Sequence, residues 1–198
     1  MTTICLVRHG ETDWNAMGKL QGREDIPLNE RGRKQAAMVG EYLKSEQFSA
    51  VVTSPLLRAK QTAEIVNAYI GDLPLAVDRD FIEKSYGEAS GLTISERDQK
   101  FPEGNIPGLE PFDHIKERVI RGLDQVKTSH PNKNVLLVAH GGLINVILAL
   151  LSNGKIGTGK TKLFNTCISH IATKDDSWQI IDYNCIDHLS RFGKVTSI

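Results

Sequence analysis

The chain of 198 residues has no excess charge of either sign, since 24 Lys and Arg stand against 24 Asp and Glu. A zero net charge removes the general case for binding nucleic acid or a membrane surface, although a local basic pocket is compatible with it. No apolar stretch reaches the length of a bilayer span, because the longest candidate, 143–151, is interrupted by Asn145. The N-terminus also lacks a basic region followed by an apolar signal core, since Arg8 comes too early. We therefore expect a cytoplasmic protein that has neither nucleic acid nor a membrane as a partner.

Cysteine is scarce as well. The three cysteines are Cys5, Cys167 and Cys185, an odd number at wide spacing, and each lies in a β-like run. This pattern predicts buried, reduced thiols rather than disulfides or a metal cluster. No linker rich in Pro, Gly or Ser, no low-complexity tract and no repeat divides the chain, and 40% apolar residues are enough for a substantial core. We expect a single domain over 1–198.

Strand-like and helix-like patterns alternate along the chain. Strands are predicted at 3–7, 50–53, 75–77 and 135–139, a closing hairpin at 167–173 and 178–183 around the turn 174–177, and amphipathic helices at 36–43, 56–70, 112–126 and 144–151. Asn29 is the candidate N-cap ahead of the first helix, and Gly71 is expected to end the second. This alternation predicts right-handed βαβ units and an α/β fold, a three-layer α/β/α sandwich with a mainly parallel central sheet. The irregular stretch 78–111 predicts an active-site loop or cap segment with one short helix.

Two similar runs, each a buried strand followed by His and Gly, lie far apart in the chain. The first contains Arg8 and His9, and the second contains His140 and Gly141. Ligands of such folds bind at the carboxyl ends of strands, so the two runs predict one site built from both halves. A neutral imidazole is a nucleophile that can become phosphohistidine, and a transferring phosphoryl group needs fixed cations such as Arg8 and Arg58. The combination indicates chemistry on a phosphate.

Five ordered blocks of the sequence then carry a family resemblance. They are Leu-Val-Arg-His-Gly-Glu-Thr-x-x-Asn at 6–15, Leu-Asn-Glu-Arg-Gly at 28–32, Ser-Pro-Leu-x-Arg-Ala-x-Gln-Thr-Ala at 54–63, Glu-Lys-Ser-Tyr-Gly-x-x-x-Gly-Leu at 83–92 and Val-Ala-His-Gly-Gly at 138–142, with Asn-Thr-Cys-Ile at 165–168 following. Together they resemble the histidine phosphatase superfamily, also called phosphoglycerate mutase-like, over nearly the whole chain. The resemblance implies the phosphoglycerate mutase-like fold.

The resemblance also implies roles for individual residues. His9 matches the nucleophile that forms phosphohistidine, and Glu83 matches the acid that protonates the leaving oxygen and then activates water. The residues matching the phosphate- and substrate-binding positions are Arg8, Asn15, Gln21, Gly22, Arg58, His140 and Gly141. Neither a metal nor a cofactor is implied, and the partner is a small phosphate monoester. Lys84 stands where many relatives have Arg, which leaves a substrate contact at that position open.

Several alternatives stay open at the level of sequence. The short segment 91–111 carries only Arg97 and Lys100 as cations, which favours an open phosphatase pocket over the enclosed pocket of a phosphoglycerate mutase-type transfer. Binding of phosphorylated ligands without turnover is the alternative outside enzymes. A zinc site built from His9, His140 and Glu83 is disfavoured because two arginines would repel a dication. The alcohol half of the substrate, polar or partly apolar, and assembly into a homo-oligomer are left undetermined.

Overall fold

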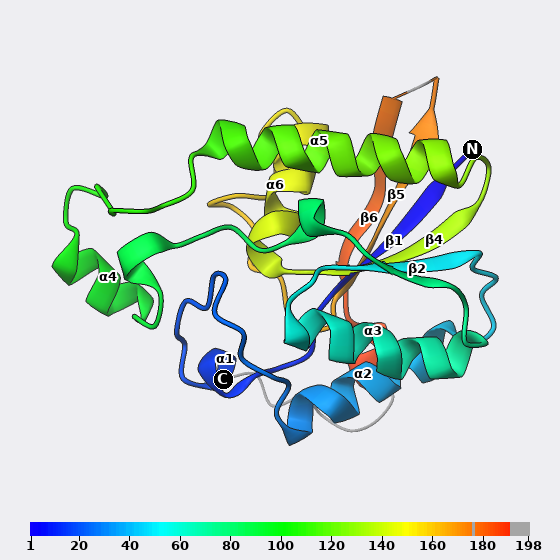
Figure 1. The fold of residues 1–198 in the computed structure, drawn as a ribbon, viewed down its shortest axis with the longest axis horizontal. Helices are drawn as coiled ribbons and strands as arrows, with labels where there is room; N and C mark the ends of the chain where they lie inside the picture. Colours follow the sequence, from blue (N-terminus) through cyan, green and yellow to red (C-terminus); the bar gives the residue numbers. More distant parts are fainter. Residues whose placement is uncertain (176, 191–198) are drawn as a thin grey trace.

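A six-stranded sheet forms the centre of the computed structural model, which describes residues 1–175 and 177–190 (Figure 1). The strands are β1 (Thr3–Arg8), β2 (Ala50–Thr53), β3 (Leu75–Val77), β4 (Asn134–Ala139), β5 (Ile168–Lys174) and β6 (Ser177–Cys185), in the spatial order β3-β2-β4-β1-β5-β6. The four strands from β3 to β1 are parallel, β5 is antiparallel to β1, and β6 is antiparallel to β5. The predicted, mainly parallel sheet and its closing hairpin are confirmed. Asp176 of the expected turn lies outside the described residues.

Helices cover both faces of this sheet. The helix α2 (Glu30–Leu43) and the helix α3 (Leu57–Ile70) lie on one face, and α5 (Phe112–Ser129) and α6 (Gly141–Leu151) lie on the other (Figure 1). The short helix α7 (Asp187–Ser190) packs against α2, and α1 (Asp13–Ala16) lies apart from the sheet in the segment after β1. The three-layer sandwich is confirmed. None of the helices in the described part of the chain is long and apolar enough to cross a membrane.

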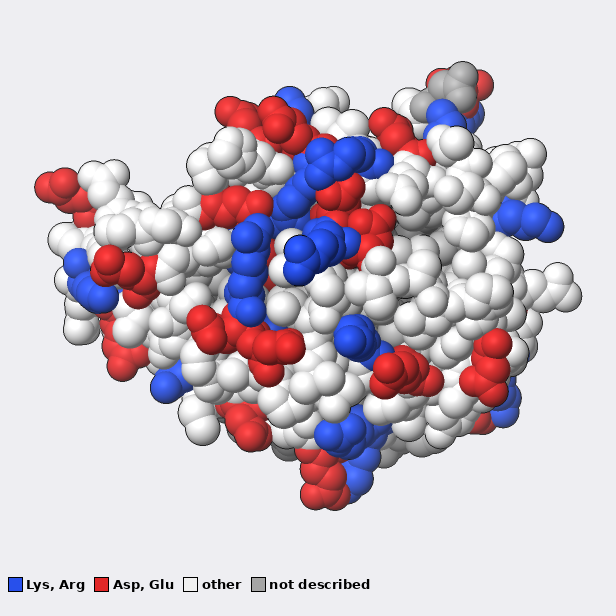
Figure 2. All heavy atoms as spheres, viewed as in Figure 1, with Lys and Arg blue, Asp and Glu red and all other residues white. Residues whose placement is uncertain are grey.

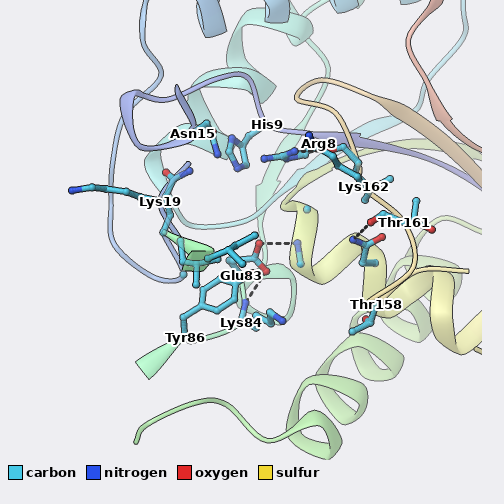
Figure 3. Close-up of a pocket in the computed structure, with 18 of the residues that line it drawn as sticks. Arg8, His9, Asn15, Lys19, Glu83, Lys84, Tyr86, Thr158, Thr161 and Lys162 are labelled. Carbon is cyan, nitrogen blue, oxygen red and sulfur yellow. Dashed lines mark hydrogen bonds between the residues drawn. The ribbon is translucent and has the colours of Figure 1, made fainter. Parts of the chain in front are cut away.

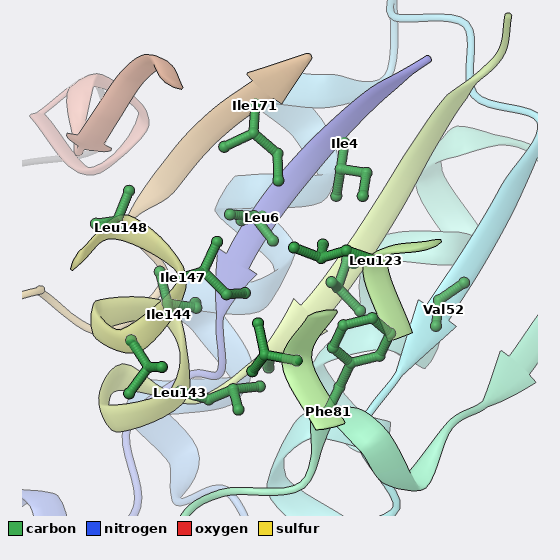
Figure 4. Close-up of a cluster of buried hydrophobic side chains, with 14 of the residues drawn as sticks. Ile4, Leu6, Val52, Phe81, Leu123, Leu143, Ile144, Ile147, Leu148 and Ile171 are labelled. Carbon is green, nitrogen blue, oxygen red and sulfur yellow. The ribbon is translucent and has the colours of Figure 1, made fainter. Parts of the chain in front are cut away.

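The core is divided by the pleat of β1. Ile4 and Leu6 point toward α5 and α6, in the same buried cluster as Ile147 and Phe81 (Figure 4), whereas Cys5 and Val7 face α2 and α3. Side chains of a strand alternate between its two faces, so a strand buried on both faces is apolar throughout. The continuous apolar sequence at 3–7 and 135–139 has this cause.

Local signals set the helix ends. The side chain of Asn29 accepts a hydrogen bond from the backbone N–H of Gly32 at 2.8 Å and begins α2, as predicted. Gly71 ends α3 in the left-handed conformation, with φ of 109°. Both ends lie where the sequence placed them.

Two expectations need correction. The stretch 78–111 contains α4 (Ile94–Lys100) and also the 3₁₀ helices η1 (Arg79–Phe81) and η2 (Gly87–Ala89), so it is more structured than a loop with one helix. Cys185 is only half-buried, while Cys5 and Cys167 are buried as expected. The difference arises because β6 is an edge strand, and an edge strand is covered less than a central one.

Candidate active site

His9 lies directly after β1, at the carboxyl end of the parallel strands. Its backbone N–H donates to the carbonyl oxygen of Ala139 at the end of β4, at 3.0 Å. Its Nδ1 lies 2.7 Å from the carbonyl oxygen of Gly10, an atom that can only accept, so Nδ1 carries the proton. The opposite nitrogen, Nε2, therefore presents a lone pair, and Nε of Arg58 donates to it at 3.2 Å.

The surroundings of His9 keep its imidazole neutral. The side chain is 3% exposed, and burial is the main cause that lowers its pKa well below 6.5. The guanidinium groups of Arg58 and Arg8 lower the pKa further because they oppose a second positive charge. A neutral imidazole whose Nε2 carries no proton is a competent nucleophile once the hydrogen bond from Arg58 shifts to an incoming phosphoryl group.

Arg58, in the first turn of α3, is fixed by backbone carbonyls. Its Nη1 donates to Glu24 and its Nη2 to Gly22, both at 2.7 Å, and the residue is 1% exposed. Burial lowers its pKa to about 10, so it stays charged at neutral pH. Arg8 donates from Nη1 to the carbonyl oxygen of Leu163, and its buried Nε has no partner among the described residues. Both guanidinium groups are held in place before any ligand arrives.

His140 is fully buried beside His9, with 5.2 Å between the ring centroids. Its Nε2 lies 2.7 Å from Oγ of Ser54, and that oxygen also accepts from the backbone N–H of Leu56 at 3.3 Å. The Ser54 hydroxyl proton has no other acceptor among the described residues, so we assign the Ser54 O–H as the donor to Nε2. The proton of His140 then sits on Nδ1, which is buried without a partner in the described structure and is free to donate to a ligand.

Glu83 caps the start of α6 with its carboxylate. Oε2 accepts from the backbone N–H of Gly142 at 2.9 Å, and Oε1 accepts from the backbone N–H of Lys84 at 2.9 Å. A Cβ on Gly142 would lie 2.6 Å from Oε1, so the carboxylate occupies space that only glycine leaves. These two hydrogen bonds hold Glu83, from the segment 78–111, beside the end of β4 that is followed by His140.

Arg118 of α5 holds the backbone that leads to Glu83. Its Nη1 donates to the carbonyl oxygens of Asp80 and Ile82 at 2.7 and 2.6 Å. Its Nε and Nη2 bind the two carboxylate oxygens of Glu110 at 3.0 and 3.2 Å, and Glu110 also accepts from the backbone N–H of Ser85. Sequence reasoning missed Arg118 because nothing in its helical context distinguishes it from a surface arginine.

These residues meet in a cavity of about 330 Å³ (Figure 3). The predicted residues that line it are Arg8, His9, Asn15, Gln21, Gly22, Arg58, Glu83 and Gly141. His140 does not line the cavity, because it is buried beside His9 instead. All nine predicted site residues are thus gathered at one end of the sheet.

Asn15 and Gln21 differ in how far their polar atoms are already used. Oδ1 of Asn15 accepts from the backbone N–H of Thr12 and from the side chain of Asn165, both at 3.2 Å. Oε1 of Gln21 is buried and has no partner within the described part of the chain. Only the amide nitrogen of Asn15 is therefore left for a ligand, whereas the whole amide of Gln21 is available.

The opposite wall of the cavity was not anticipated. It is formed by the segment Thr158–Leu163, together with Asn145 of α6. The run 153–162 is rich in Gly, Lys and Thr, a composition that could have indicated a loop at the site. Its position could not be predicted, because it depends on how the chain returns from α6 to β5.

The metal alternative finds no support in the geometry. In residues 1–175 and 177–190, no three His, Cys, Asp or Glu side chains are grouped so that they could hold a metal ion. The charge beside His9 comes from Arg8 and Arg58, which would repel a dication.

Comparisons with known proteins place this geometry in a family. Residues 4–186 match the model of the histidine phosphatase superfamily (branch 1). The chain is 46% identical over 194 residues to PhoE of Bacillus subtilis (strain 168), an uncharacterized phosphatase, covering 98% of this chain and 100% of that protein. It is 35% identical to a metal-independent phosphoserine phosphatase of Arabidopsis thaliana, covering 98% of this chain and 85% of that protein. The structure of a phosphoserine phosphatase from Entamoeba histolytica, in complex with 3-phosphoglyceric acid, matches with a TM-score of 0.84 and 28% identity, covering 96% of this chain and 100% of that one.

Proposed function

The chain belongs to the histidine phosphatase superfamily, and from this premise we propose that it hydrolyses phosphate monoesters in two steps through a phosphohistidine on Nε2 of His9. The observation that carries the proposal is the state of His9: a neutral imidazole, with its proton held on Nδ1 by Gly10 and its Nε2 lone pair facing Arg58. The two cations that keep His9 neutral also supply positive charge for a phosphoryl group.

In the first step, Nε2 of His9 attacks phosphorus and the bond from phosphorus to the alcohol oxygen breaks. Charge on the three equatorial oxygens is stabilised by Arg8, Arg58 and Nδ1–H of His140. Nε of Arg8 and Nδ1 of His140 are buried and have no partner among the described residues, and Nε of Arg58 already points at Nε2 of His9. The amides of Asn15 and Gln21, at the edge of the cavity, provide further contacts.

Glu83 in its protonated form gives its proton to the leaving alcohol oxygen. An alkoxide is a poor leaving group, and general acid catalysis typically contributes ~10²- to 10⁴-fold. In the second step the Glu83 carboxylate takes a proton from water, the water oxygen bonds to phosphorus, and the bond from phosphorus to Nε2 breaks. Inorganic phosphate leaves, and both His9 and Glu83 return to their starting states.

Hydrolysis is favoured over a mutase reaction by the construction of the cavity. A mutase must keep its substrate enclosed while the phosphoryl group returns. Here the cap segment 78–111 contributes only Glu83, Lys84, Tyr86 and Ile94 to the cavity lining, and its α4 lies away from the sheet (Figure 1). Water therefore has access to a phosphoenzyme.

The test is turnover of p-nitrophenyl phosphate by the wild-type protein and by His9→Ala, with His9→Asn as a polar control of similar size. We expect a loss of at least ~10³-fold in both variants, because the covalent route is closed. Rapid quenching of the wild type in denaturant at alkaline pH should trap a phosphoenzyme that is stable to base and is lost on later treatment with acid. Equal rates in wild type and His9→Ala would refute the phosphohistidine mechanism.

A wild-type protein that binds monoesters but turns none of them over would support the alternative of a non-catalytic binding protein. Efficient interconversion of 2- and 3-phosphoglycerate with little phosphate release would instead identify a mutase. These outcomes are separable because phosphate release and isomerisation are measured in the same reaction mixture.

We also propose that the chain forms one domain and acts in the cytoplasm. One domain over 1–198 is supported by the single sheet that carries the described layers. A cytoplasmic location is supported by the three free thiols of Cys5, Cys167 and Cys185.

A further inference from the structure

The cavity is strongly basic although the chain as a whole is neutral. Its lining contains five cationic side chains and one acidic side chain, Glu83. Elsewhere, acidic and basic side chains are interspersed, as Figure 2 shows for one face. Two of the five cations, Arg8 and Arg58, flank His9 and serve the phosphoryl group. The other three, Lys19, Lys84 and Lys162, exceed what one phosphoryl group needs.

These lysines are not used to neutralise acidic side chains. Within the described residues, none of the three forms an ion pair with a carboxylate. The ammonium of Lys84 lies over the ring of Tyr86, 4.8 Å from its centroid, and that of Lys19 lies over Trp14 at 5.7 Å. Lys19 points away from His9 in Figure 3, and it contributes to lowering the pKa of Glu96, so it is not a candidate for binding the substrate.

Lys162 belongs to a wall that is fixed to α6. The side-chain amide of Asn145 donates to the carbonyl oxygen of Thr161 at 2.9 Å, and the carbonyl oxygen of Asn145 accepts from the backbone N–H of Thr158 at 3.2 Å. A Cβ on Gly157 would lie 2.3 Å from that carbonyl oxygen, so glycine permits the close approach. The wall is held in place without any ligand.

The cavity therefore has two differently built sides. In Figure 3, Arg8 and His9 lie at one end, Glu83 and Lys84 along one side, and Thr158, Thr161 and Lys162 along the other. A phosphoryl group on His9 leaves the alcohol half of the substrate between Lys84 and Lys162. A lysine on each side of that space, with the threonine hydroxyl groups beside Lys162, is complementary to an anion and not to an apolar group.

We propose that Lys84 and Lys162, with the hydroxyl groups of Thr158 and Thr161, bind a second anionic group on the alcohol half, so that the preferred substrates are small phosphate monoesters that also carry a carboxylate or a second phosphate. This inference rests on the proposed function. A cavity of about 330 Å³ is at the small end for ligand sites and limits the alcohol half to a few carbon atoms.

The experiment compares kcat/KM for two substrates that differ by one group, 3-phosphoglycerate with a carboxylate and glycerol 3-phosphate with a neutral hydroxymethyl group. A second pair, propane-1,3-diol bisphosphate and propyl phosphate, tests in the same way whether the second anionic group is a phosphate. Wild type, Lys84→Met and Lys162→Met are compared, because Met keeps the aliphatic length and removes the charge. The matched control is Lys155→Met, an exposed lysine of the same segment that does not line the cavity.

We expect the wild type to prefer the anionic member of at least one pair by about tenfold or more, which corresponds to about 1.4 kcal/mol. Each cavity variant should lower that preference several-fold, and the preference should weaken with added salt, whereas Lys155→Met leaves it unchanged. The pair that shows the preference identifies carboxylate or phosphate as the group bound.

No preference in either pair, or a preference that survives both cavity substitutions, would overturn the inference while leaving the proposed function intact. Failure of the proposed function is distinguishable, because the wild type would then turn over none of the four substrates and no p-nitrophenyl phosphate.

Discussion

Arg118→Ala is the substitution that best tests how the fold positions its acid. In the wild type, Arg118 satisfies the carbonyl oxygens of Asp80 and Ile82 and both carboxylate oxygens of Glu110. Its side chain and that of Glu110 are each 9% exposed, so the alanine variant leaves a nearly buried carboxylate and two carbonyl groups without this donor. Breaking a buried ion pair from one side costs about 3–5 kcal/mol. Glu110 keeps its ion pair with Arg23 at 3.1 Å and the N–H of Ser85, so we expect the lower end of that range.

A loss at the lower end of that range lowers the melting temperature by roughly 6–12 °C for a chain of this size. Arg118→Lys keeps the positive charge but loses the planar guanidinium that binds the carbonyl groups and the carboxylate together. It should therefore be destabilised less than Arg118→Ala. Urea unfolding and thermal melting measure both changes. The matched control is Arg121→Ala, because Arg121 is on the same helix and pairs with Asp80 but is 64% exposed. That variant should lose less than ~1 kcal/mol.

The catalytic readout separates positioning from general destabilisation. Ile82 immediately precedes Glu83, so releasing its carbonyl should displace the acid. We expect folded Arg118→Ala to lose more activity on an alkyl phosphate than on an aryl phosphate, because a phenolate leaves without a proton. The alkyl-to-aryl rate ratio should recover partly in Arg118→Lys and stay at the wild-type value in Arg121→Ala. Equal losses on both substrates, or a stability loss no greater than that of Arg121→Ala, would refute this role of Arg118.

Other changes test the site directly. Glu83→Gln should slow alkyl phosphates by ~10²-fold or more and aryl phosphates far less, and parallel losses would exclude Glu83 as the leaving-group acid. Gly142→Ala should reduce the alkyl rate with little effect on folding, since its Cβ would lie 2.6 Å from Oε1 of Glu83, and an unchanged rate would show that the carboxylate moves freely. On an aryl phosphate, whose phenolate leaves without a proton from Glu83, kcat/KM should show no loss as the pH falls through 6.5, because the lowered pKa of His9 keeps its imidazole neutral there. The free energy of unfolding should fall as the pH drops below 6.5, because His9 takes up a proton in the unfolded chain but stays neutral in the folded chain. A free energy of unfolding that rises in that range would contradict the lowered pKa of His9.

Local patterns predicted most of the fold. The apolar runs at 3–7 and 135–139 indicate strands covered on both faces, and Asn29 and Gly71 mark helix ends, because these signals act between residues close in sequence. The position of the residues predicted to bind phosphate also followed from local order, since the carboxyl ends of neighbouring parallel strands meet at one edge. The sequence alone was enough to predict that Arg8, His9 and His140 lie at one site.

The other contacts depend on segments that meet only in the folded chain. Glu110 pairs with Arg118, and Lys162 joins a wall opposite Lys84 because Asn145 fixes that wall to α6. No periodicity or motif specifies such pairings, since each side chain alone resembles an ordinary surface residue.

The sequence by itself thus determined the α/β layers, the family and the groups around the phosphoryl position, which are encoded by residues near strand ends. Only the tertiary structure decided which lysines remain without an acidic partner inside the cavity, and which arginine holds the acid. The physical reason is that charge pairing and burial are set by distances across the fold, whereas strand and helix patterns are set along the chain.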